Sequence, residues 1–184
     1  AVVTLTLALG SQRMVERNAL VRRLPVVESL GSVDTILTDK TGTLTESRMT
    51  VTRVECGGEI CEVTGTGLDT TGEFRQDGEA VDPDLVAPVL RCGAVCNNAE
   101  RAPDDEDRAY FGDPTEVALL VSAAKAGIDR SGERVREVPF SSDRGRMTVV
   151  IAEDGGHTAY LKGAPEVVLD RCDTVLVDGD PVAL

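Results

Sequence analysis

Residues 39–45 of the chain read DKTGTLT, and they directly follow the apolar run VDTILT at residues 33–38. A short, β-branched and nearly continuous apolar run is typical of a strand buried in a parallel sheet, so we expect Asp39 at the carboxyl end of such a strand. Open α/β sheets bind their ligands at this edge. A carboxylate followed by hydroxyl side chains and a turn-forming glycine is suited to attack a phosphoryl group, which makes Asp39 the predicted nucleophile. The alternative is that Asp39 only caps a turn after the strand.

The motif at 39–45 resembles, over all seven residues, the phosphorylation signature of the P-type ATPases, which are ion pumps built on a haloacid-dehalogenase-like core. The resemblance implies that Asp39 attacks the γ-phosphate of ATP, with Mg²⁺ held partly by the Asp39 carboxylate and by the backbone carbonyl of Thr41. Thr41 would also help to hold the phosphate. Related phosphatases carry an aspartate general acid where this chain has Thr41. A threonine has no useful pKa for that task, so we expect the phosphorylated intermediate to persist.

Residues 1–51 as a whole resemble the end of the fourth transmembrane helix and the start of the phosphorylation domain in type II pumps. The segments that carry this resemblance are ALGSQRM at 8–14, NALVRRLPVVESLGS at 18–32 and DKTGTLTESRMTV at 39–51. The apolar start AVVTLTLAL at 1–9 is far shorter than the ~20 residues that span a bilayer. We expect a helix that leaves a membrane on the cytoplasmic side, and the alternative is an amphipathic surface helix. LPVVESLGS is more similar to calcium or sodium/potassium pumps than to proton pumps.

Composition and charge exclude several other classes of protein. The formal net charge of −13 argues against binding to nucleic acid or to anionic membrane surfaces, both of which attract clustered Lys and Arg. The five cysteines are an odd number without a CxxC pair, so reduced cytosolic thiols are the default interpretation. Cys92 and Cys96 would share one face of a helix. Two buried thiols are favoured there over a metal site, which would need more ligands nearby.

The fold class that we expect is α/β, with two domains. Residues 1–47 would hold the end of the transmembrane helix and the first strand of a haloacid-dehalogenase-like phosphorylation domain. Residues 48–184 would form an α+β nucleotide-binding lobe with a mainly antiparallel sheet. Gly57-Gly58 predicts a hairpin turn, residues 65–78 predict a loop, and residues 101–108 predict a charged loop. Further strands are predicted at 134–140, 146–153, 157–162 and from 175, and helices at 83–98, 114–127 and 163–171.

The helix predicted from Pro114 has a strong start signal. Asp113 is a suitable N-cap residue, and Pro114 suits the first helical position. Glu116 stands where the carboxylate of a capping box would reach back to the N-cap. Helix capping alone can therefore explain why these residues occur here, although capping by Glu116 is compatible with contact to a ligand.

Three segments of the second domain resemble the nucleotide-binding segments of type II pumps: KGAPE at 162–166, FSSDR at 140–144 with Met147 beyond it, and GDPTE at 112–116. The resemblance implies that the Phe140 ring stacks on adenine and that the Glu116 carboxylate meets the adenine edge. Lys162 would reach a phosphate or the adenine beside Gly163, where the backbone can come close. Taken singly, Phe140 could be a core residue and Lys162 a solvated strand end. Many relatives carry an arginine where this chain has Ser142, which predicts weak ATP binding unless Arg144 or Arg146 takes over.

The function that these features predict is that of a cytoplasmic fragment of an ATP-driven cation pump, from a bacterial plasma membrane, that forms an aspartyl phosphate with ATP and Mg²⁺. Its partners would be ATP and the rest of the same pump: the remaining phosphorylation domain, the actuator domain and the membrane helices, which would also hold the transported cation. We expect the fragment alone not to be competent for phosphorylation. One alternative is a haloacid-dehalogenase-type phosphatase, against which Thr41 and the Lys162 motif speak. Another is a nucleotide-binding module without catalysis.

Overall fold

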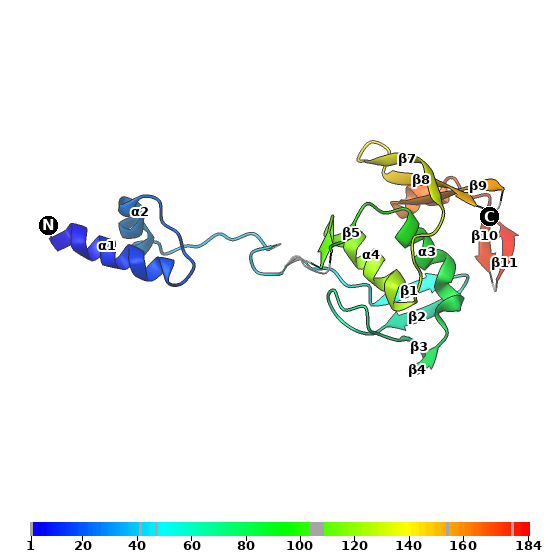
Figure 1. The fold of residues 1–184 in the computed structure, drawn as a ribbon, viewed down its shortest axis with the longest axis horizontal. Helices are drawn as coiled ribbons and strands as arrows, with labels where there is room; N and C mark the ends of the chain where they lie inside the picture. The colour runs from blue at the N-terminus through cyan, green and yellow to red at the C-terminus, as the bar shows by residue number, and fades with distance from the viewer. Residues whose placement is uncertain (1, 41, 47, 104–108, 154, 178) are drawn as a thin grey trace. The chain divides into compact units, whose positions relative to one another are not determined.

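The computed structural model describes the chain except residues 1, 41, 47, 104–108, 154 and 178 (Figure 1). The chain divides into two compact units, Ala1–Glu46 and Ser47–Leu184. The division falls immediately after the DKTGTLT motif, so the predicted nucleophile belongs to the first unit and the three predicted nucleotide segments belong to the second.

The first unit contains two helices, α1 at Val2–Val15 and α2 at Leu24–Gly31. They pack on each other near Gly10, where an added Cβ would lie 3.8 Å from a methyl group of Val27. No residue of α1 is fully buried. Within the described residues, no helix is both long enough and apolar enough to cross a membrane.

The strand predicted at 33–38 is wrong, because residues 33–39 have no regular secondary structure. The side chains of Ile36 and Leu37 are 83% and 95% exposed. A parallel strand is stabilised by hydrogen bonds to neighbouring strands and by burial of both its faces. No strand of the described part of the chain pairs with this segment, so its apolar residues are not part of a sheet. The expected haloacid-dehalogenase-like parallel sheet is therefore not present among these residues.

The second unit begins with an antiparallel sheet of order β1-β2-β3-β4. Its strands are β1 at Arg53–Cys56, β2 at Glu59–Val63, β3 at Phe74–Gln76 and β4 at Glu79–Val81. The predicted hairpin is confirmed between β1 and β2, whose turn residues Gly57 and Gly58 have φ of 61° and 90°.

The loop predicted at 65–78 is wrong in its last part, because β3 begins at Phe74 and forms a second hairpin with β4. Its turn is Asp77-Gly78, with φ of 52° and 86°, which is the Asp-Gly pair that tight hairpins prefer. Each strand of this hairpin has three residues, too few for an alternating pattern to stand out from the Gly- and Thr-rich sequence before it.

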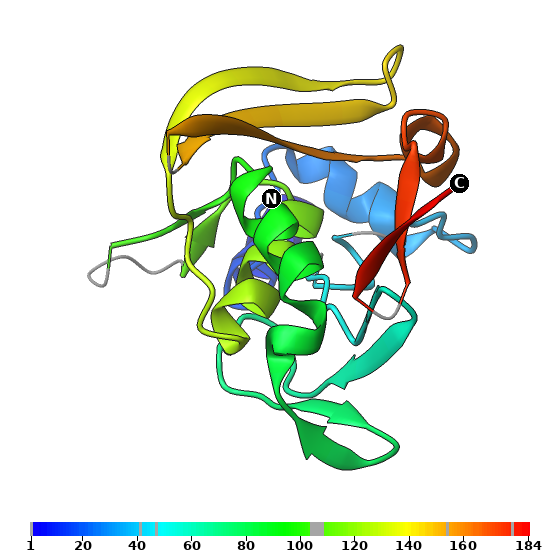
Figure 2. The ribbon, with the colours of Figure 1, turned by 90° about the vertical axis from the view of Figure 1, so that its right-hand side faces the viewer.

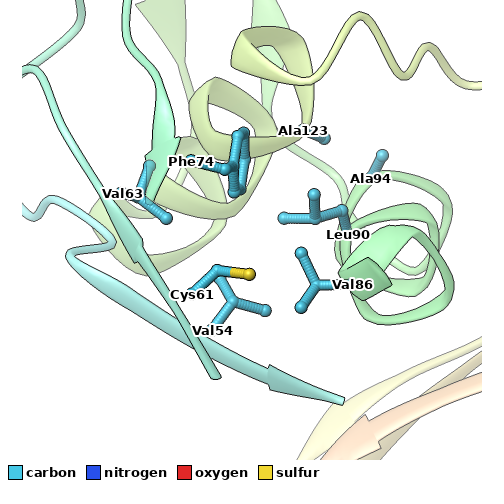
Figure 3. Close-up of a cluster of buried hydrophobic side chains, with 8 residues drawn as sticks. All are labelled: Val54, Cys61, Val63, Phe74, Val86, Leu90, Ala94 and Ala123. Atoms are coloured by element: carbon cyan, nitrogen blue, oxygen red, sulfur yellow. The ribbon is translucent and has the colours of Figure 1, made fainter. Parts of the chain in front are cut away.

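Two helices, α3 at Ala87–Val95 and α4 at Pro114–Lys125, pack on each other and on the apolar face of this sheet. The 3₁₀ turn η1 at Pro83–Val86 leads into α3, so the helix predicted at 83–98 is confirmed in type, but it starts in a tighter winding and ends at Val95. Figure 3 shows how side chains from the sheet and from the helices close on each other to form this core. Its buried members are Val54, Cys61, Val63, Phe74, Val86, Leu90, Ala94 and Ala123.

A second antiparallel sheet, of order β7-β8-β9, lies on the other side of α3 (Figure 2). Its strands, β7 at Glu133–Ser141, β8 at Arg146–Glu153 and β9 at Gly156–Gly163, confirm the three predicted strands in order and type. Alternate residues of β8 are buried, and these form a second core with the end of α3. The buried members of this core are Val95, Cys96, Met147, Val149 and Ile151.

One polar contact at the edge of this second core joins α3 directly to β9. The Arg91 guanidinium donates a 2.8 Å hydrogen bond to the Tyr160 hydroxyl and lies 5.9 Å from the centre of the Tyr160 ring. It also donates to Ser131 at 2.7 Å and forms an ion pair with Glu153. The α3 helix is thus attached to the second sheet both by apolar packing and by the hydrogen bonds and ion pair of Arg91.

The remaining elements are short. Strand β5 at Glu100–Arg101 pairs with β6 at Tyr110–Phe111, and the charged loop predicted between them lies largely outside the described residues, at positions 104–108. Helix α5 at Pro165–Leu169 follows β9. The strand predicted from 175 is confirmed as a hairpin of β10 at Thr174–Val177 and β11 at Asp180–Ala183. The second unit is therefore a mixed fold of helices and antiparallel sheets, as predicted.

The packing of α3 against the first sheet can be tested at Leu90, which is 3% exposed within the first core. Leu90→Ala is expected to lower the free energy of unfolding by about 2–5 kcal/mol, because it removes buried methyl groups and leaves a cavity. Leu85→Ala, at a residue of η1 that is 42% exposed, is the control and should cost less than about 1 kcal/mol. Urea denaturation followed by circular dichroism measures both. Equal losses in the two variants would contradict this description of the core.

Candidate functional site

The three segments singled out in the sequence meet at one cavity of about 690 Å³ in the second unit. The cavity lies where the first turn of α4 faces strands β7, β8 and β9. Small-molecule sites usually have volumes of roughly 300–1,000 Å³, so this one can hold a nucleotide-sized ligand. The lining residues that matter most for recognition are Asn98, Glu116, Phe140, Met147, Lys162 and Gly163.

Lys162 and Glu116 form an ion pair in the wall of the cavity. The Lys162 ammonium donates to Glu116 Oε1 at 2.6 Å, and the two side chains are only 24% and 17% exposed. The other carboxylate oxygen, Oε2, accepts a 3.2 Å hydrogen bond from the backbone N–H of Asn98. Both oxygens of Glu116 are therefore held in place, and the pair ties β9 to α4.

The start of α4 confirms one half of the predicted cap. The Asp113 carboxylate accepts a 2.8 Å hydrogen bond from the backbone N–H of Thr115, as an N-cap should. The capping-box prediction for Glu116 is wrong, because its carboxylate contacts Lys162 and Asn98 instead of the N-cap backbone. Pairing with the Lys162 ammonium adds the attraction between two opposite charges, which the neutral N–H of the N-cap cannot supply.

Phe140 lies on the cavity wall with 60% of its surface exposed, so it is not a core residue. The pairing of β7 with β8 shifts register between Val138 and Ser141, and such irregularities re-aim side chains at the end of a strand. Met147, which is 1% exposed, forms an apolar floor. The cavity lining thus includes both an exposed aromatic ring and a buried thioether.

Gly163 is required by close packing rather than by its own backbone angles. A Cβ added at this position would lie 2.5 Å from the carbonyl oxygen of Gly145 and 2.7 Å from the Cβ of Arg146. Any side chain would push β9 away from the β7–β8 turn. The glycine therefore allows the end of β9, with Lys162, to stay against the cavity.

Comparison with known proteins bears directly on this site. Residues 86–184, which include every lining residue named above, match the family described as P-type ATPase, cytoplasmic domain N. The match covers more than half of the chain. The chain belongs to the P-type cation ATPases.

Curated relatives of this P-type ATPase chain agree with the assignment. It is 46% identical to the cation-transporting ATPase pma1 of Synechocystis sp., over 97% of this chain and 21% of that protein. It is 40% identical to a calcium-transporting ATPase of Bacillus subtilis, over 97% of this chain and 21% of that protein. It is also 40% identical to calcium-transporting ATPase type 2C member 1 of Homo sapiens, over 100% of this chain and 21% of that protein. The chain thus spans about a fifth of the length of these relatives.

The arginines suggested as replacements at Ser142 do not line the cavity of this P-type ATPase chain. The Arg144 guanidinium donates to the backbone carbonyl of Pro139 at 3.1 Å, and Arg146 donates to the carbonyl of Arg144 at 3.1 Å. Arg146 also precedes the buried Met147 on β8, so it points to the opposite face of the sheet. In this arrangement both guanidinium groups hold the β7–β8 turn.

The predicted nucleophile lies in the other unit, in an exposed turn. The Asp39 carboxylate accepts a 2.7 Å hydrogen bond from the backbone N–H of Lys40, whose carbonyl accepts from Leu44 and Thr45 at 3.1 and 3.2 Å. Thr41 lies outside the described residues. No group of three or more His, Cys, Asp or Glu side chains suited to a metal is found among the residues described.

Two features near the cavity escaped the sequence-based predictions or were only partly foreseen. The thiols of Cys92 and Cys96 donate to the carbonyls of Leu161 and Met147 at 3.5 and 3.6 Å, and burial raises the pKa of both thiols. Both belong to the second core: Cys96 is buried, as predicted, whereas Cys92 is only partly buried. The roles of Asn97 and Asn98 were missed, because the predicted helix at 83–98 included both residues, whereas α3 ends before them at Val95.

The Lys162–Glu116 ion pair can be tested by a double-mutant cycle with Lys162→Met and Glu116→Gln. A coupling energy of about 0.5–3 kcal/mol is expected in urea denaturation, because the two groups are in contact and partly shielded from water. The control is the exposed pair Arg75–Glu73, which has a similar 2.7 Å separation but side chains that are 44% and 57% exposed. Its coupling should not exceed about 0.5 kcal/mol. Equal coupling energies in both pairs would show that partial burial does not strengthen the Lys162–Glu116 ion pair.

Proposed function

We propose that this chain binds ATP in the cavity of its second unit and that, in the intact cation pump, the γ-phosphoryl group of that ATP is transferred to Asp39. The observation that carries the proposal is the convergence of Phe140, Glu116 and Lys162 on one cavity, although they lie on three elements that are well separated in sequence. An aromatic face can stack on a base, a carboxylate can accept from its amino group and an ammonium can bind a phosphate, so together the three groups suit an adenine nucleotide.

The base would bind through stacking and one polar contact. The exposed face of the Phe140 ring can stack on adenine, and the Met147 floor excludes water beneath it. The ionised Glu116 carboxylate can only accept hydrogen bonds. It therefore matches the 6-amino group of adenine, which donates, better than the 6-oxo group of other purines.

Lys162 would serve the base side and the phosphate side together. An ammonium has three N–H donors, and one of them is directed to Glu116 at 2.6 Å. The other two can reach ligand atoms. Because Gly163 lets β9 approach closely, the ammonium stays at the cavity wall and contributes positive charge in a chain whose net charge is −13.

The phosphoryl step would use groups in both units. An Asp39 carboxylate oxygen attacks the γ-phosphorus in line, the bond from that phosphorus to the β–γ bridging oxygen breaks, and ADP leaves. Mg²⁺, held by the Asp39 carboxylate and the Thr41 carbonyl, would neutralise charge on the phosphoryl oxygens. The rest of the pump would supply the remaining ligands and the membrane helices that bind the transported cation. We place this pump in a bacterial plasma membrane, with ATP as the partner of the present chain.

The binding site is tested by Phe140→Ala, which should weaken ATP binding by about ten-fold or more, because stacking of a base on an aromatic ring is worth roughly 1–3 kcal/mol. Isothermal titration calorimetry measures the affinity. Phe111→Ala is the matched control, since Phe111 is 40% exposed but does not line the cavity. The ATP site would be refuted by unchanged affinity in both Phe140→Ala and Lys162→Ala.

A further prediction is that the chain alone binds ATP but forms no aspartyl phosphate. Phosphoryl transfer depends on positioning and on neutralisation of charge, and Asp39 lies in an exposed turn without a sheet around it. The assay incubates the chain with Mg²⁺ and γ-labelled ATP and looks for an acid-stable, hydroxylamine-sensitive label. A stoichiometric label that is absent from Asp39→Asn would show that the site is complete in this chain and that the prediction is wrong.

A further inference from the structure

Asn97, two residues beyond the end of α3, carries the most deeply buried polar side chain in the described part of the chain, with 0% exposure. Among the described residues only one other polar side chain, that of Ser122, is also buried. An amide group taken out of water is unfavourable unless its hydrogen bonds are completed inside the protein. The partners of Asn97 therefore indicate what the residue is for.

All four hydrogen-bonding positions of the Asn97 amide are used. Its Nδ2 donates to the carbonyl of Gly93 at 2.9 Å and to the carbonyl of Glu116 at 2.7 Å. Its Oδ1 accepts from the backbone N–H of Ala99 at 2.8 Å and from the Arg130 guanidinium at 3.4 Å. Two of these partners belong to the end of α3 and the turn after it, and Glu116 belongs to the first turn of α4. The amide thus fixes one helix end against the other.

Glu116 is held at both of its ends by consecutive residues. Asn97 binds its backbone carbonyl, and the backbone N–H of Asn98 binds its carboxylate at 3.2 Å. Arg134 in turn fixes the pair, because it donates to the Asn97 carbonyl and to the Asn98 side chain, each at 2.8 Å. The direction of the Glu116 carboxylate in the cavity is therefore set by the Asn97-Asn98 peptide as well as by Lys162.

We propose that Asn97 is a positioning residue for base selection: it fixes the first turn of α4 so that the Glu116 carboxylate faces the 6-position of a bound purine. The inference rests on the proposed ATP site and goes beyond it, since Asn97 does not line the cavity and would act only through Glu116. Without the amide, the first turn of α4 can shift against the end of α3. The carboxylate then loses its fixed direction and, with it, its preference for a 6-amino group over a 6-oxo group.

The experiment compares the affinities of the full chain for ATP and for inosine triphosphate, which differs from ATP by a 6-oxo group and the N–H beside it. In the wild type we expect tighter binding of ATP. In Asn97→Ala the ratio of the two affinities should fall by about three- to ten-fold, which is the loss of roughly one neutral hydrogen bond. Only folded molecules bind either nucleotide, so a lower folded fraction leaves this ratio unchanged.

Three further variants make the result specific. Asn97→Asp keeps the size and the acceptors of the side chain but loses the donor to Glu116, and it should lower the ratio as well. Glu116→Gln removes the acceptor-only carboxylate and should lower the ratio at least as far. Ser122→Ala is the control: Ser122 is buried in α4 and donates its hydrogen bond to the carbonyl of Leu119 and not to Glu116, so the ratio should stay at the wild-type value.

The outcomes separate the two proposals. A wild-type ratio in both Asn97 variants, or an equal fall in Ser122→Ala, would overturn the positioning role of Asn97 and leave the ATP site intact. Equal affinity of the wild type for both nucleotides would also overturn it, since Glu116 would then not select the base. Failure of the wild type to bind either nucleotide would overturn the proposed ATP site itself.

Discussion

The second unit depends on one constraint: α3 has to bury two opposite sides at once. Leu90 and Ala94 pack against the β1–β4 sheet, whereas Val95 and Cys96 pack against β7–β9. A helix buried on both sides has little freedom to rotate or slide, because each shift that improves one core opens a cavity in the other. The end of α3 therefore has a well-defined position. The polar residues that follow it, Asn97 and Asn98, are held in well-defined positions as well.

The candidate site follows from this constraint. Its three recognition groups come from β7, α4 and β9; α4 and β7 follow each other in the chain, and β8 separates β7 from β9. They meet because α4 packs on α3 and because β7–β9 cover the other side of α3. The Lys162–Glu116 ion pair then closes the remaining gap between sheet and helix at 2.6 Å. A partly buried pair of this kind contributes direction and specificity more reliably than stability.

Much of this could be predicted from the sequence, but for unequal reasons. The strands β7, β8 and β9 and the cap at Asp113 were predictable because alternation, turn glycines and capping residues act locally. The partners of Phe140, Glu116 and Lys162 were predictable only through the resemblance to the family, because spacing along the chain does not say which elements meet. Asn97 could not be found at all, since a buried amide and a surface amide look the same in a sequence. The strand predicted at 33–38 was wrong for the opposite reason. Its sequence pattern is local, but a parallel strand forms only when neighbouring strands pair with it.

Because Tyr160 contacts Arg91 of α3, the fluorescence of this tyrosine reports on the interface between α3 and β9. The chain has no tryptophan and only two tyrosines, so its intrinsic fluorescence comes from Tyr110 and Tyr160 alone. Tyr160 packs against the core that joins α3 to β9, whereas Tyr110 packs against a separate cluster around Val117 and Val121. Each ring therefore senses a different interface, and replacing either tyrosine with phenylalanine leaves a single emitter. The separation of the second sheet from α3 can in this way be followed in real time without any attached dye.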